Sequence, residues 1–500
     1  MTEFDPFAAQ VFRANAYVPA AGCATSEIIN PATLEVVGKI TLGSRDLVEA
    51  VAGDARTAQR HWKKTDAKSK AALLHRIADA IEQTDFHDVA RLMTLEMGKP
   101  YPEAVGELYN VAPAFRYFAE IARDDGGKVA GTTQYGSFQY SVYEPYGVSV
   151  HIMPFNFPIL LMAWTVAASL AAGNACIVKP AAATSLCTLK FMEHFQKLLP
   201  AGLVSCVTGG AATAQALIAS DNTHAVAFTG SVAAGRAVNM ACAERFKPCV
   251  IEAGGNDPMI ISEHADIEQA VAGTVTSAFH LSGQICTSSE RLFVHEKVHD
   301  EFVGKFADAA SKLRIGNGLD KSEIGPLVSE AARDKVMALV EGAVGEGARI
   351  ICGGRIPPNH NTGWYYEPTI LASVTPDMAI MGQEIFGPVA PVCKVESFDQ
   401  ALEYANASEF GLGACVFTTD LKEAMRAAEL LEAGMVWVNN PLIDNDALPF
   451  GGRKNSGLGR ELGRHGLDAF RQTKMVIIDH EPVIHDWWYP YPDDVFYGDS

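Results

Sequence analysis

The sequence predicts an α/β protein with two doubly wound domains. Short apolar runs alternate with longer helical patterns from Val148 to Glu252, and the alternation resumes after Pro258. Apolar strands separated by helices are typical of a parallel sheet covered by helices on both faces. The length of 500 residues agrees with this prediction, because it suits about three structural units of ordinary size.

The N-terminal part of the chain is predicted to be mostly helical. After a turn-rich opening, apolar residues recur with helical spacing in several consecutive runs. Gly98-Lys99-Pro100 ends the third run, because Gly and Pro are typical of the end of a helix. The predicted helices span residues 44–64, 68–83, 86–97 and 101–122.

The first α/β region follows an exposed strand at 136–143, where polar and apolar side chains alternate. The next segment, from Pro145 to Val178, has no Lys, Arg, Asp or Glu and is long enough to span a membrane. Two prolines and Gly173-Asn174 interrupt it, so we predict strands at 148–153 and 175–178 around a buried helix at 159–171. Strands at 203–209, 225–230 and 249–255 then alternate with helices at 185–199, 211–220 and 233–245.

A second α/β region begins after the turn cluster Gly254-Gly255-Asn256-Asp257-Pro258, which we predict to be a domain boundary. Its predicted strands lie at 258–262, 291–296, 349–354, 368–374, 390–395, 413–418 and 435–440, and its helices at 267–280, 298–313, 398–405 and 421–432. Residues 470–479 alternate again like an exposed strand, and an aromatic segment follows them.

Charge and cysteine content exclude several classes of protein. The net charge of −19 repels phosphate backbones and anionic membrane surfaces, so we expect no nucleic-acid or membrane partner. The ten cysteines form no CxxC pair and no metal-ligand spacing, so we predict reduced thiols and no metal site. The N-terminus lacks the basic and apolar regions of an export signal, which predicts a cytoplasmic protein.

One turn is a candidate phosphate site. The GxGxxG dinucleotide fingerprint does not occur in the sequence. Residues 228–235, FTGSVAAG, instead end a strand in a Gly-bounded turn that starts a helix. The N–H groups at a helix start suit a pyrophosphate, although an ordinary strand-to-helix turn is the alternative.

Three side chains are candidates for catalysis. Cys286 lies among small and flexible residues, in GQICT, as an accessible nucleophilic thiol requires. Glu252 ends an apolar strand, where desolvation would raise its pKa into the range of a general base; a structural salt bridge is the alternative. Asn156, in PFNFP, could aim its amide at an oxyanion or could cap a helix.

These motifs occur in one order along the chain: PFNFP at 154–158, KP at 179–180, FTGS at 228–231, EAGGN at 252–256, GQIC at 283–286, EIFGP at 384–388 and PFGG at 449–452. In this order, and with this separation of Glu252 and Cys286, the chain resembles the NAD(P)-dependent aldehyde dehydrogenase superfamily. The resemblance covers the chain from about residue 28 to about residue 480.

The resemblance implies two doubly wound α/β domains plus a small β arm for oligomerisation. The cofactor-binding domain would comprise residues 1–130 and 146–254, and the catalytic domain residues 255–468. The arm and tail would comprise residues 131–145 and 469–500, which contain both exposed strands. Pairing between subunits would remove the unpaired strand edges, so a homodimer or homotetramer is expected.

The resemblance also implies the roles of site residues. Cys286 would be the nucleophile and Glu252 the general base, and the Asn156 amide with the backbone N–H of Cys286 would form the oxyanion hole. The cofactor, NAD or NADP, would contact Lys179 through its adenosine ribose, and Glu384 and Phe386 through its nicotinamide ribose. The further cofactor-binding residues would be Phe155, Gly230, Ser231 and Gly235.

Departures from the family's pattern bear on the cofactor. NAD-preferring relatives place an acid on the ribose hydroxyls three residues after the lysine, where this chain has Ala182. Without that carboxylate a 2′-phosphate is not repelled, so we predict that NADP is tolerated beside NAD. Phe155 and Ala253 stand where many relatives have Trp and Leu, and both replacements keep an apolar side chain.

The resemblance places the substrate, a small-molecule aldehyde, in a funnel whose predicted contacts are Met162, Trp164, Ile285, Thr287, Asp444 and Phe450. An aromatic or medium aliphatic aldehyde fits these residues, and a cationic amino-aldehyde is a second possibility through cation–π contact and the acidic loop. Succinate-semialdehyde enzymes place an Arg at the position of Trp164, which argues against a short semialdehyde with a carboxylate. A core-packing role for Trp164 is the structural alternative.

Two other functions stay open. A coenzyme-A-acylating relative would pass the acyl group to a thiol, but such relatives typically lack the base at Glu252. A non-enzymatic protein that retains the fold would have no use for Cys286, Glu252, Asn156 and Glu384. The aromatic tail, with Trp487, Trp488, Tyr489 and Tyr491, is predicted to dock on a neighbouring subunit.

Overall fold

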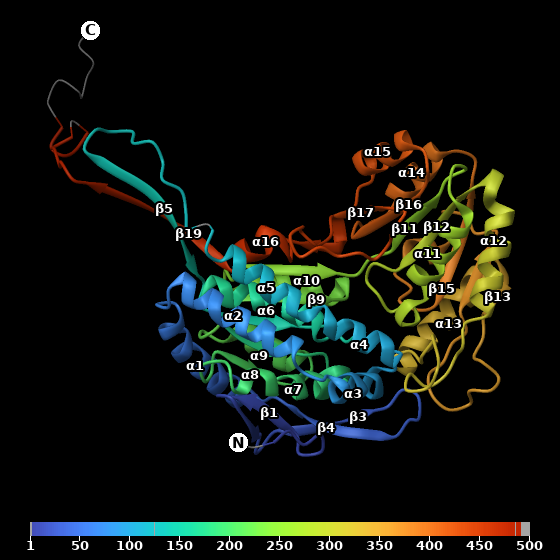
Figure 1. Ribbon diagram of the computed structural model, residues 1–500, viewed down its shortest axis with the longest axis horizontal. Helices are drawn as coiled ribbons and strands as arrows, with labels where there is room; N and C mark the ends of the chain where they lie inside the picture. Colours follow the sequence, from blue (N-terminus) through green and yellow to red (C-terminus); the bar gives the residue numbers. More distant parts are fainter. Residues whose placement is uncertain (1–2, 125, 486, 492–500) are drawn as a thin grey trace, which may run out of the picture.

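A computed structural model describes residues 3–124, 126–485 and 487–491 of the chain. Two α/β bodies lie side by side, and a two-stranded ribbon projects from the first of them (Figure 1). The outermost residues of the predicted first domain (1–2), residue 125, and residues 486 and 492–500 of the predicted tail lie outside the described residues.

The first body is built on an eight-stranded sheet with the strand order β18-β10-β9-β6-β7-β8-β1-β2. Its central strands are parallel: β6 (Val148–Ile152), β7 (Ala175–Lys179), β8 (Val204–Cys206), β9 (Ala225–Gly230) and β10 (Cys249–Ala253). The antiparallel edges are β1 (Gln10–Arg13) and β2 (Ala16–Pro19) on one side and β18 (Gly457–Leu458) on the other. β3 (Ala24–Ile29) and β4 (Val36–Leu42) form a separate pair.

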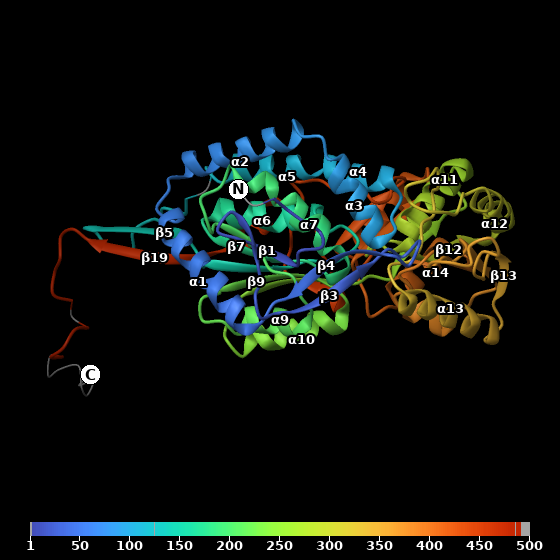
Figure 2. The same ribbon diagram turned by 90° about the horizontal axis from the view of Figure 1, so that it is seen from below.

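Helices cover both faces of this sheet, as the sequence predicts (Figure 2). One face contacts α1 (Arg45–Trp62), α9 (Ala211–Ala219) and α10 (Val232–Ala243). The other contacts α6 (Leu160–Ala172), which packs under α2 (Ala67–Glu82) and α5 (Val111–Ile121). The remaining helices of this body are α3 (His87–Met97), α4 (Tyr101–Tyr109), α7 (Ser185–Phe191) and α8 (Glu193–Gln196).

The uncharged stretch around α6 is explained by its place between two layers. Every residue from Leu160 to Ala171 is buried, because the helix contacts the sheet on one side and α2 and α5 on the other. A helix enclosed in this way is hydrophobic all round. Among the described residues, no helix combines the length and the apolar character that a membrane crossing requires.

The second body has a seven-stranded sheet with the order β13-β14-β15-β12-β11-β16-β17, parallel except for the β13–β14 pair. The strands are β11 (Asp257–Ile261), β12 (Ser289–His295), β13 (Arg349–Cys352), β14 (Thr369–Ala372), β15 (Val389–Val395), β16 (Gly413–Phe417) and β17 (Met435–Val438). α11 (Ile267–Phe279) and α12 (Glu296–Ser311) pack on one face, while α14 (Phe398–Asn406) and α15 (Leu421–Leu430) pack on the other; α13 (Glu330–Gly345) completes the body.

The predicted fold class is confirmed by these two doubly wound sheets. The two predicted exposed strands pair with each other, since β5 (Ser137–Pro145) and β19 (Arg471–Asp479) form an antiparallel ribbon along their whole length. Asn174 fixes the base of the ribbon to the first body, because it accepts a hydrogen bond from Gly147 N and donates one to Phe470 O.

Some elements differ from the sequence predictions. The strands β1 to β4 and the helix α13 lie where we predicted no element, and the predicted helix over 101–122 is two helices that meet at Asn110. The division between the domains differs at its second boundary. β18 and α16 (Gly463–Asp468), predicted within the second domain, pair with β10 and pack on α6 of the first body, because the chain crosses back after β17.

Candidate active site

The strand order of the first sheet creates a crevice at one end of its central strands. β7 and β8 follow β6 on one side, whereas β9 and β10 lie on its other side. The order in which successive strands are added to the sheet therefore reverses between the parallel strands β6 and β9. Ligands of open α/β sheets bind outside the carboxyl ends of the strands at such a switch point. A cavity of about 480 Å³ lies here, and its wall includes Phe155, Asn156, Lys179, Gly230, Ser231, Glu252, Cys286, Glu384 and Phe386.

A second cavity, of about 600 Å³, meets the first one at Cys286. Its wall is mainly apolar and comes from α4, α6, the loop around Cys286 and the segment after β17. Phe157, Trp164, Ile285, Thr287, Asp444 and Phe450 belong to it. Among the described residues, Cys286 is the only one that lines both cavities. It therefore lies between two cavities of different composition.

The loop before Cys286 has an unusual backbone. Leu281 and Ser282 both have left-handed conformations, with φ values of 55° and 56°. Such conformations are uncommon for residues with a side chain and occur where the surrounding structure holds them. A close approach also fixes the other side of the loop, because a Cβ at Gly255 would lie 2.3 Å from the carbonyl oxygen of Cys286.

Glu252 lies on β10 beside Cys286, and its carboxyl group is buried. Burial raises the pKa of Glu252 well above its ordinary value; the nearby Glu461 raises it further, and a hydrogen bond with the Cys286 thiol lowers it. Burial also raises the pKa of Cys286 well above its usual range, and the negative charge of Glu252 adds to this shift. Burial therefore disfavours the ionised form of both groups, and the hydrogen bond between them couples their acid–base equilibria.

Two hydrogen bonds fix the orientation of the Asn156 side chain in the wall of the first cavity. Its Oδ1 accepts a hydrogen bond from Phe157 N, and its Nδ2 donates to the carbonyl oxygen of Gln284, two residues before Cys286. An amide nitrogen carries two N–H groups, so a second donor remains on Nδ2. The helix-cap alternative is not what the structure shows, since the N-terminus of α6 is capped by Glu107 and not by Asn156.

The cofactor-side residues predicted from the sequence largely lie in the first cavity. Lys179 ends β7 in a buried position, and burial lowers its pKa to about 8. Ser231 is the N-cap of α10 and accepts a hydrogen bond from Ala234 N. Gly235 was predicted here too, but Ala234 lines the cavity instead; Gly235 packs against β10, where a Cβ would lie 3.0 Å from Cγ2 of Ile251.

Glu384 reaches the site through close backbone contacts. A Cβ at Gly254 would lie 2.2 Å from Oε1 of Glu384, and Gly255 N donates a hydrogen bond to the same oxygen. Burial raises the pKa of Glu384 to about 7. Phe386, with a φ of 55°, packs edge-to-face against Phe155 at 5.7 Å between ring centroids.

One predicted substrate residue is misplaced. Met162 is fully buried in the core and is not among the residues that line the second cavity, whereas Leu160, Leu161 and Trp164 of the same helix line it. The sequence does not indicate which face of α6 lines the cavity, because the helix is apolar on all sides. Trp164 packs on Phe450 at 5.0 Å between ring centroids.

The outer part of the funnel is acidic. A third hollow, of about 670 Å³, shares Trp164 and Asp444 with the second cavity and adds Glu120 and Asp446. Arg116 also lines it, but this guanidinium is paired with Asp79 and Glu82. Among the described residues that line the second cavity there is no Lys or Arg.

Sequence reasoning missed several polar residues that hold the site together. Glu290 accepts hydrogen bonds from Ile385 N and Phe386 N, and so holds the loop that presents Glu384. Glu461 lies buried beside Glu252, and burial raises its pKa to about 8. Glu290 directly precedes the predicted apolar strand at 291–296, and an acid next to a buried strand is the one signal that could have been followed. In the part of the chain that the structure describes, no cluster of three or more potential metal ligands occurs.

Comparison with known proteins gives a consistent result. A family model described as the aldehyde dehydrogenase family matches residues 17–476. The chain is 37% identical over 479 residues to the chloroplastic betaine aldehyde dehydrogenase of Beta vulgaris, covering 93% of this chain and 95% of the relative. It is 38% identical over 454 residues to the succinate semialdehyde dehydrogenase of Acinetobacter baylyi, covering 90% and 93%.

Solved structures agree with the sequence matches. A crystal structure of betaine aldehyde dehydrogenase from Staphylococcus aureus in complex with NAD+ superposes with a TM-score of 0.93. The identity is 30%, and the alignment covers 97% of each chain.

Proposed function

Because this chain belongs to the aldehyde dehydrogenase family, we propose that it oxidises an aldehyde to the carboxylic acid through a thioester on Cys286, with NAD+ or NADP+ as the oxidant. The observation that supports this function best is the meeting of two cavities at Cys286, with Glu252 beside it. One cavity suits a dinucleotide and the other an organic aldehyde, so both reactants can reach the thiol from different sides.

The residues of the first cavity fit a dinucleotide. The cavity lies at the switch point of the sheet, and the start of α10 faces it with Gly230 and Ser231. N–H groups at a helix start attract a pyrophosphate. The buried ammonium of Lys179 lacks the hydration that it would have in water, and ribose hydroxyls would replace part of it. When bound, the nicotinamide supplies the acceptor for the hydride of the aldehyde.

The chain's own groups supply the remaining chemistry. Cys286 loses its thiol proton to solvent and, as the thiolate, attacks the aldehyde carbon, which forms a thiohemiacetal. The free N–H of Asn156 and the backbone N–H of Cys286 would stabilise the oxyanion, each by about 3 kcal/mol in comparable oxyanion holes. After oxidation to the thioester, Glu252 takes a proton from water, and the resulting hydroxide attacks the thioester carbon; the C–S bond breaks, so the carboxylic acid leaves and the Cys286 thiolate is restored. Glu252 is the base that a coenzyme-A-acylating enzyme would not need.

The second cavity favours an aldehyde without a carboxylate. Its wall is apolar and aromatic, and its polar rim contains Asp444 but no Lys or Arg among the described lining residues. An anionic tail would have no partner there, whereas an ammonium group could contact Trp164 and Asp444. We therefore propose an aldehyde with an ammonium-bearing tail, as the name of the betaine aldehyde dehydrogenase relative also suggests. A neutral aromatic or medium aliphatic aldehyde is the second candidate, because the inner wall is apolar.

A panel of three aldehydes of similar length tests the substrate class. We expect kcat/KM to be highest for a trimethylammonium aldehyde, lower for a neutral one, and at least about tenfold lower again for a carboxylate-bearing one, which corresponds to about 1.4 kcal/mol of lost interaction. Steady-state rates with each aldehyde measure this order. The Asp444→Asn variant is the control, since it should weaken only the preference for the cation. A preference for the carboxylate-bearing aldehyde would contradict the proposal.

Dual use of NAD+ and NADP+ is the second part of the proposal. Ala182 is exposed just beyond Lys179 and offers no charge to repel a 2′-phosphate. We expect Ala182→Glu to raise the KM for NADP+ by at least about tenfold while the KM for NAD+ changes little, because like charges in contact are strongly disfavoured. Initial rates with both cofactors measure this, with Ala182→Gln as the uncharged control. Equal changes for the two cofactors, or wild-type enzyme inactive with NADP+, would contradict it.

The projecting ribbon supports a homo-oligomer. β19 is exposed along most of its length, and Met475, Ile477 and Ile478 are among its exposed apolar side chains. The tail beyond it exposes Ile484, Trp487 and Tyr489. We propose that both surfaces pack on another copy of the chain, as a dimer or tetramer, which agrees with the tendency of proteins to cover unpaired strand edges. A cytoplasmic location remains a prediction.

A further inference from the structure

Lys99 is a fully buried cation two residues before α4, and it contacts the backbone of Asn156. Its Nζ donates a hydrogen bond to the carbonyl oxygen of Asn156 at 2.5 Å and forms an ion pair with Glu107 at 2.6 Å. The same Nζ also lies over the ring of Phe157, 4.6 Å from the ring centroid. Neither side chain of the Lys99–Glu107 pair is exposed at all.

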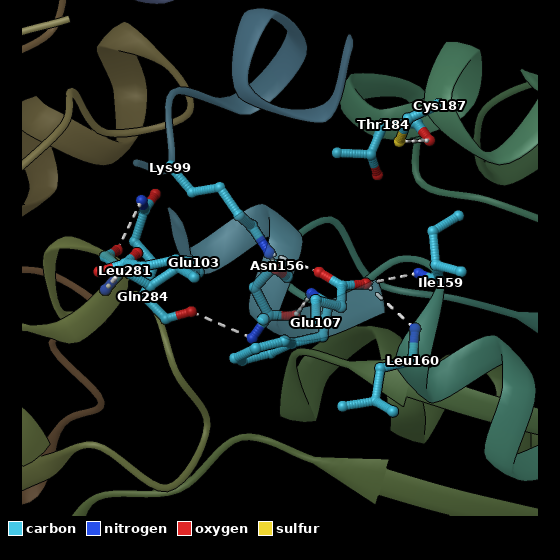
Figure 3. A network of polar contacts seen from close by, with 12 residues as sticks. Lys99, Glu103, Glu107, Asn156, Ile159, Leu160, Thr184, Cys187, Leu281 and Gln284 are labelled. Atoms are coloured by element: carbon cyan, nitrogen blue, oxygen red, sulfur yellow. Dashed lines mark hydrogen bonds and ion pairs between the residues drawn. The ribbon is translucent and has the colours of Figure 1, made fainter. Parts of the chain in front are cut away.

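Glu107 holds the other end of the same segment. Its Oε2 receives the hydrogen bond from Lys99, and its Oε1 accepts hydrogen bonds from Ile159 N at 2.8 Å and Leu160 N at 3.0 Å. These two amides belong to the start of α6, which otherwise has no side-chain cap. The ion pair therefore fixes residues 156–160 at both ends (Figure 3).

The Asn156 amide is in turn connected to the loop of the nucleophile. It donates to the carbonyl of Gln284, whose own side chain donates to Leu281 O and accepts from Val328 N. Glu103, one helical turn before Glu107 on α4, accepts from Leu281 N at 3.1 Å. Charged groups on or just before α4 thus contact both the Asn156 turn and the Cys286 loop (Figure 3).

Stability does not account for a buried ion pair in this position. Burying two charges costs as much desolvation as their attraction returns, and apolar residues of similar volume often stabilise a fold equally well. What an apolar pair cannot do is hold a carbonyl oxygen and two amide N–H groups in fixed directions. We propose that Lys99 and Glu107 are positioning residues. They hold the Asn156 amide at the distance and angle from which it can donate a hydrogen bond to the oxyanion that forms when Cys286 adds to the aldehyde. This inference rests on the role of Asn156 in the proposed function.

The test compares Lys99→Met and Glu107→Gln with wild type. We expect kcat to fall by about 100-fold in Lys99→Met, since a displacement of about 1 Å in a reacting group has this effect, and by about tenfold in Glu107→Gln, whose amide oxygen can still accept from α6. The KM of the aldehyde and the dissociation constant of NAD+ should change little. Rates are referred to the number of Cys286 thiols that an alkylating reagent titrates, so misfolded protein does not contribute.

A matched control separates positioning from folding. Glu96 is also a buried carboxylate that accepts from two consecutive amides at a helix start, Leu186 N and Cys187 N at 2.7 Å each, but it lines none of the described active-site cavities. Glu96→Gln should lower the melting temperature and leave kcat per titrated thiol within about twofold of wild type, as expected for a site independent of the reaction centre. An equal fall of kcat in Glu96→Gln would overturn the inference.

A double-mutant cycle identifies the partner. Asn156→Ala alone should lower kcat by about 100-fold to 1,000-fold, the usual effect of losing one oxyanion donor. Lys99→Met added to Asn156→Ala should then lower kcat no further, because residues that act through one group are not additive. Full additivity would overturn the positioning role while leaving the proposed function intact. If Asn156→Ala keeps the wild-type kcat, the oxyanion role itself is wrong, and this inference fails with it.

Discussion

Replacing Cys286 with alanine should abolish aldehyde-dependent NADH formation, with kcat at least about 10⁴-fold below wild type. Losses of this size follow the removal of a catalytic nucleophile, because the remaining groups stabilise an oxyanion that no longer forms. The first cavity, which is proposed to bind the dinucleotide, loses only one of its many lining side chains in this variant. NAD+ should therefore bind Cys286→Ala about as well as wild type, which calorimetry measures beside the rate.

The chain offers a matched control for this substitution. Cys352, on β13 in the second body, is a half-buried free thiol that lines neither of the cavities that meet at Cys286. Cys352→Ala should keep wild-type kinetics and its sensitivity to thiol-alkylating reagents. If Cys286→Ala turned over aldehyde at the wild-type rate, the proposed mechanism would have to be abandoned.

Glu252→Gln should produce an enzyme that reacts once and then stops. The glutamine cannot take a proton from water, so the thioester would accumulate after one NADH per active site, and kcat should fall by about 10²-fold to 10⁴-fold. Rapid-mixing absorbance records the burst, and mass spectrometry of the quenched protein detects the acyl group on Cys286. Glu96→Gln again serves as the buried carboxylate control.

The pH dependence of wild type follows from the same two groups. The pKa values of Glu252 and Cys286 are both raised by burial, so each group ionises at a higher pH than an exposed group of its kind. The ionised forms are the active base and nucleophile, so kcat and kcat/KM should increase as the pH rises through neutrality. Glu252→Gln should lose the part of this increase that appears in kcat. A linear, burst-free time course for Glu252→Gln, or turnover of wild type only with coenzyme A, would contradict the hydrolytic mechanism.

The sequence predicts the parts of this site that are local. Cys286 stands out by its small neighbours and Glu252 by its place at the end of an apolar strand, and the order of motifs connects both to Asn156. The doubly wound fold follows from the alternation of strands and helices. The ends of such a chain are harder to predict, since β1 to β4 are short strands of mixed burial and β18 returns to the first sheet from far along the chain.

Residues that act through long-range contacts gave no such signal. In the sequence, Lys99 looks like an ordinary charge in a turn and Glu107 like a surface charge on a helix. Only their contacts with the Asn156 turn and the start of α6 place them in the interior. Glu461 reaches Glu252 through a return of the chain that no local pattern encodes. Met162 illustrates the converse error, because a uniformly apolar helix does not reveal which of its faces meets a cavity.

The buried carboxyl groups around Cys286 also link the acid–base equilibrium of the site to folding. Glu252, Glu290, Glu461 and Asp257 all bind protons more tightly in the folded chain than an exposed carboxyl does, and burial raises the pKa of Glu290 and Glu461 to about 8. Unfolding therefore releases protons, and the free energy of unfolding decreases as the pH rises from the ordinary carboxyl range to about 8. The alkaline conditions that activate the nucleophile and the base are thus the conditions in which these four carboxyl groups contribute least to the stability of the native state.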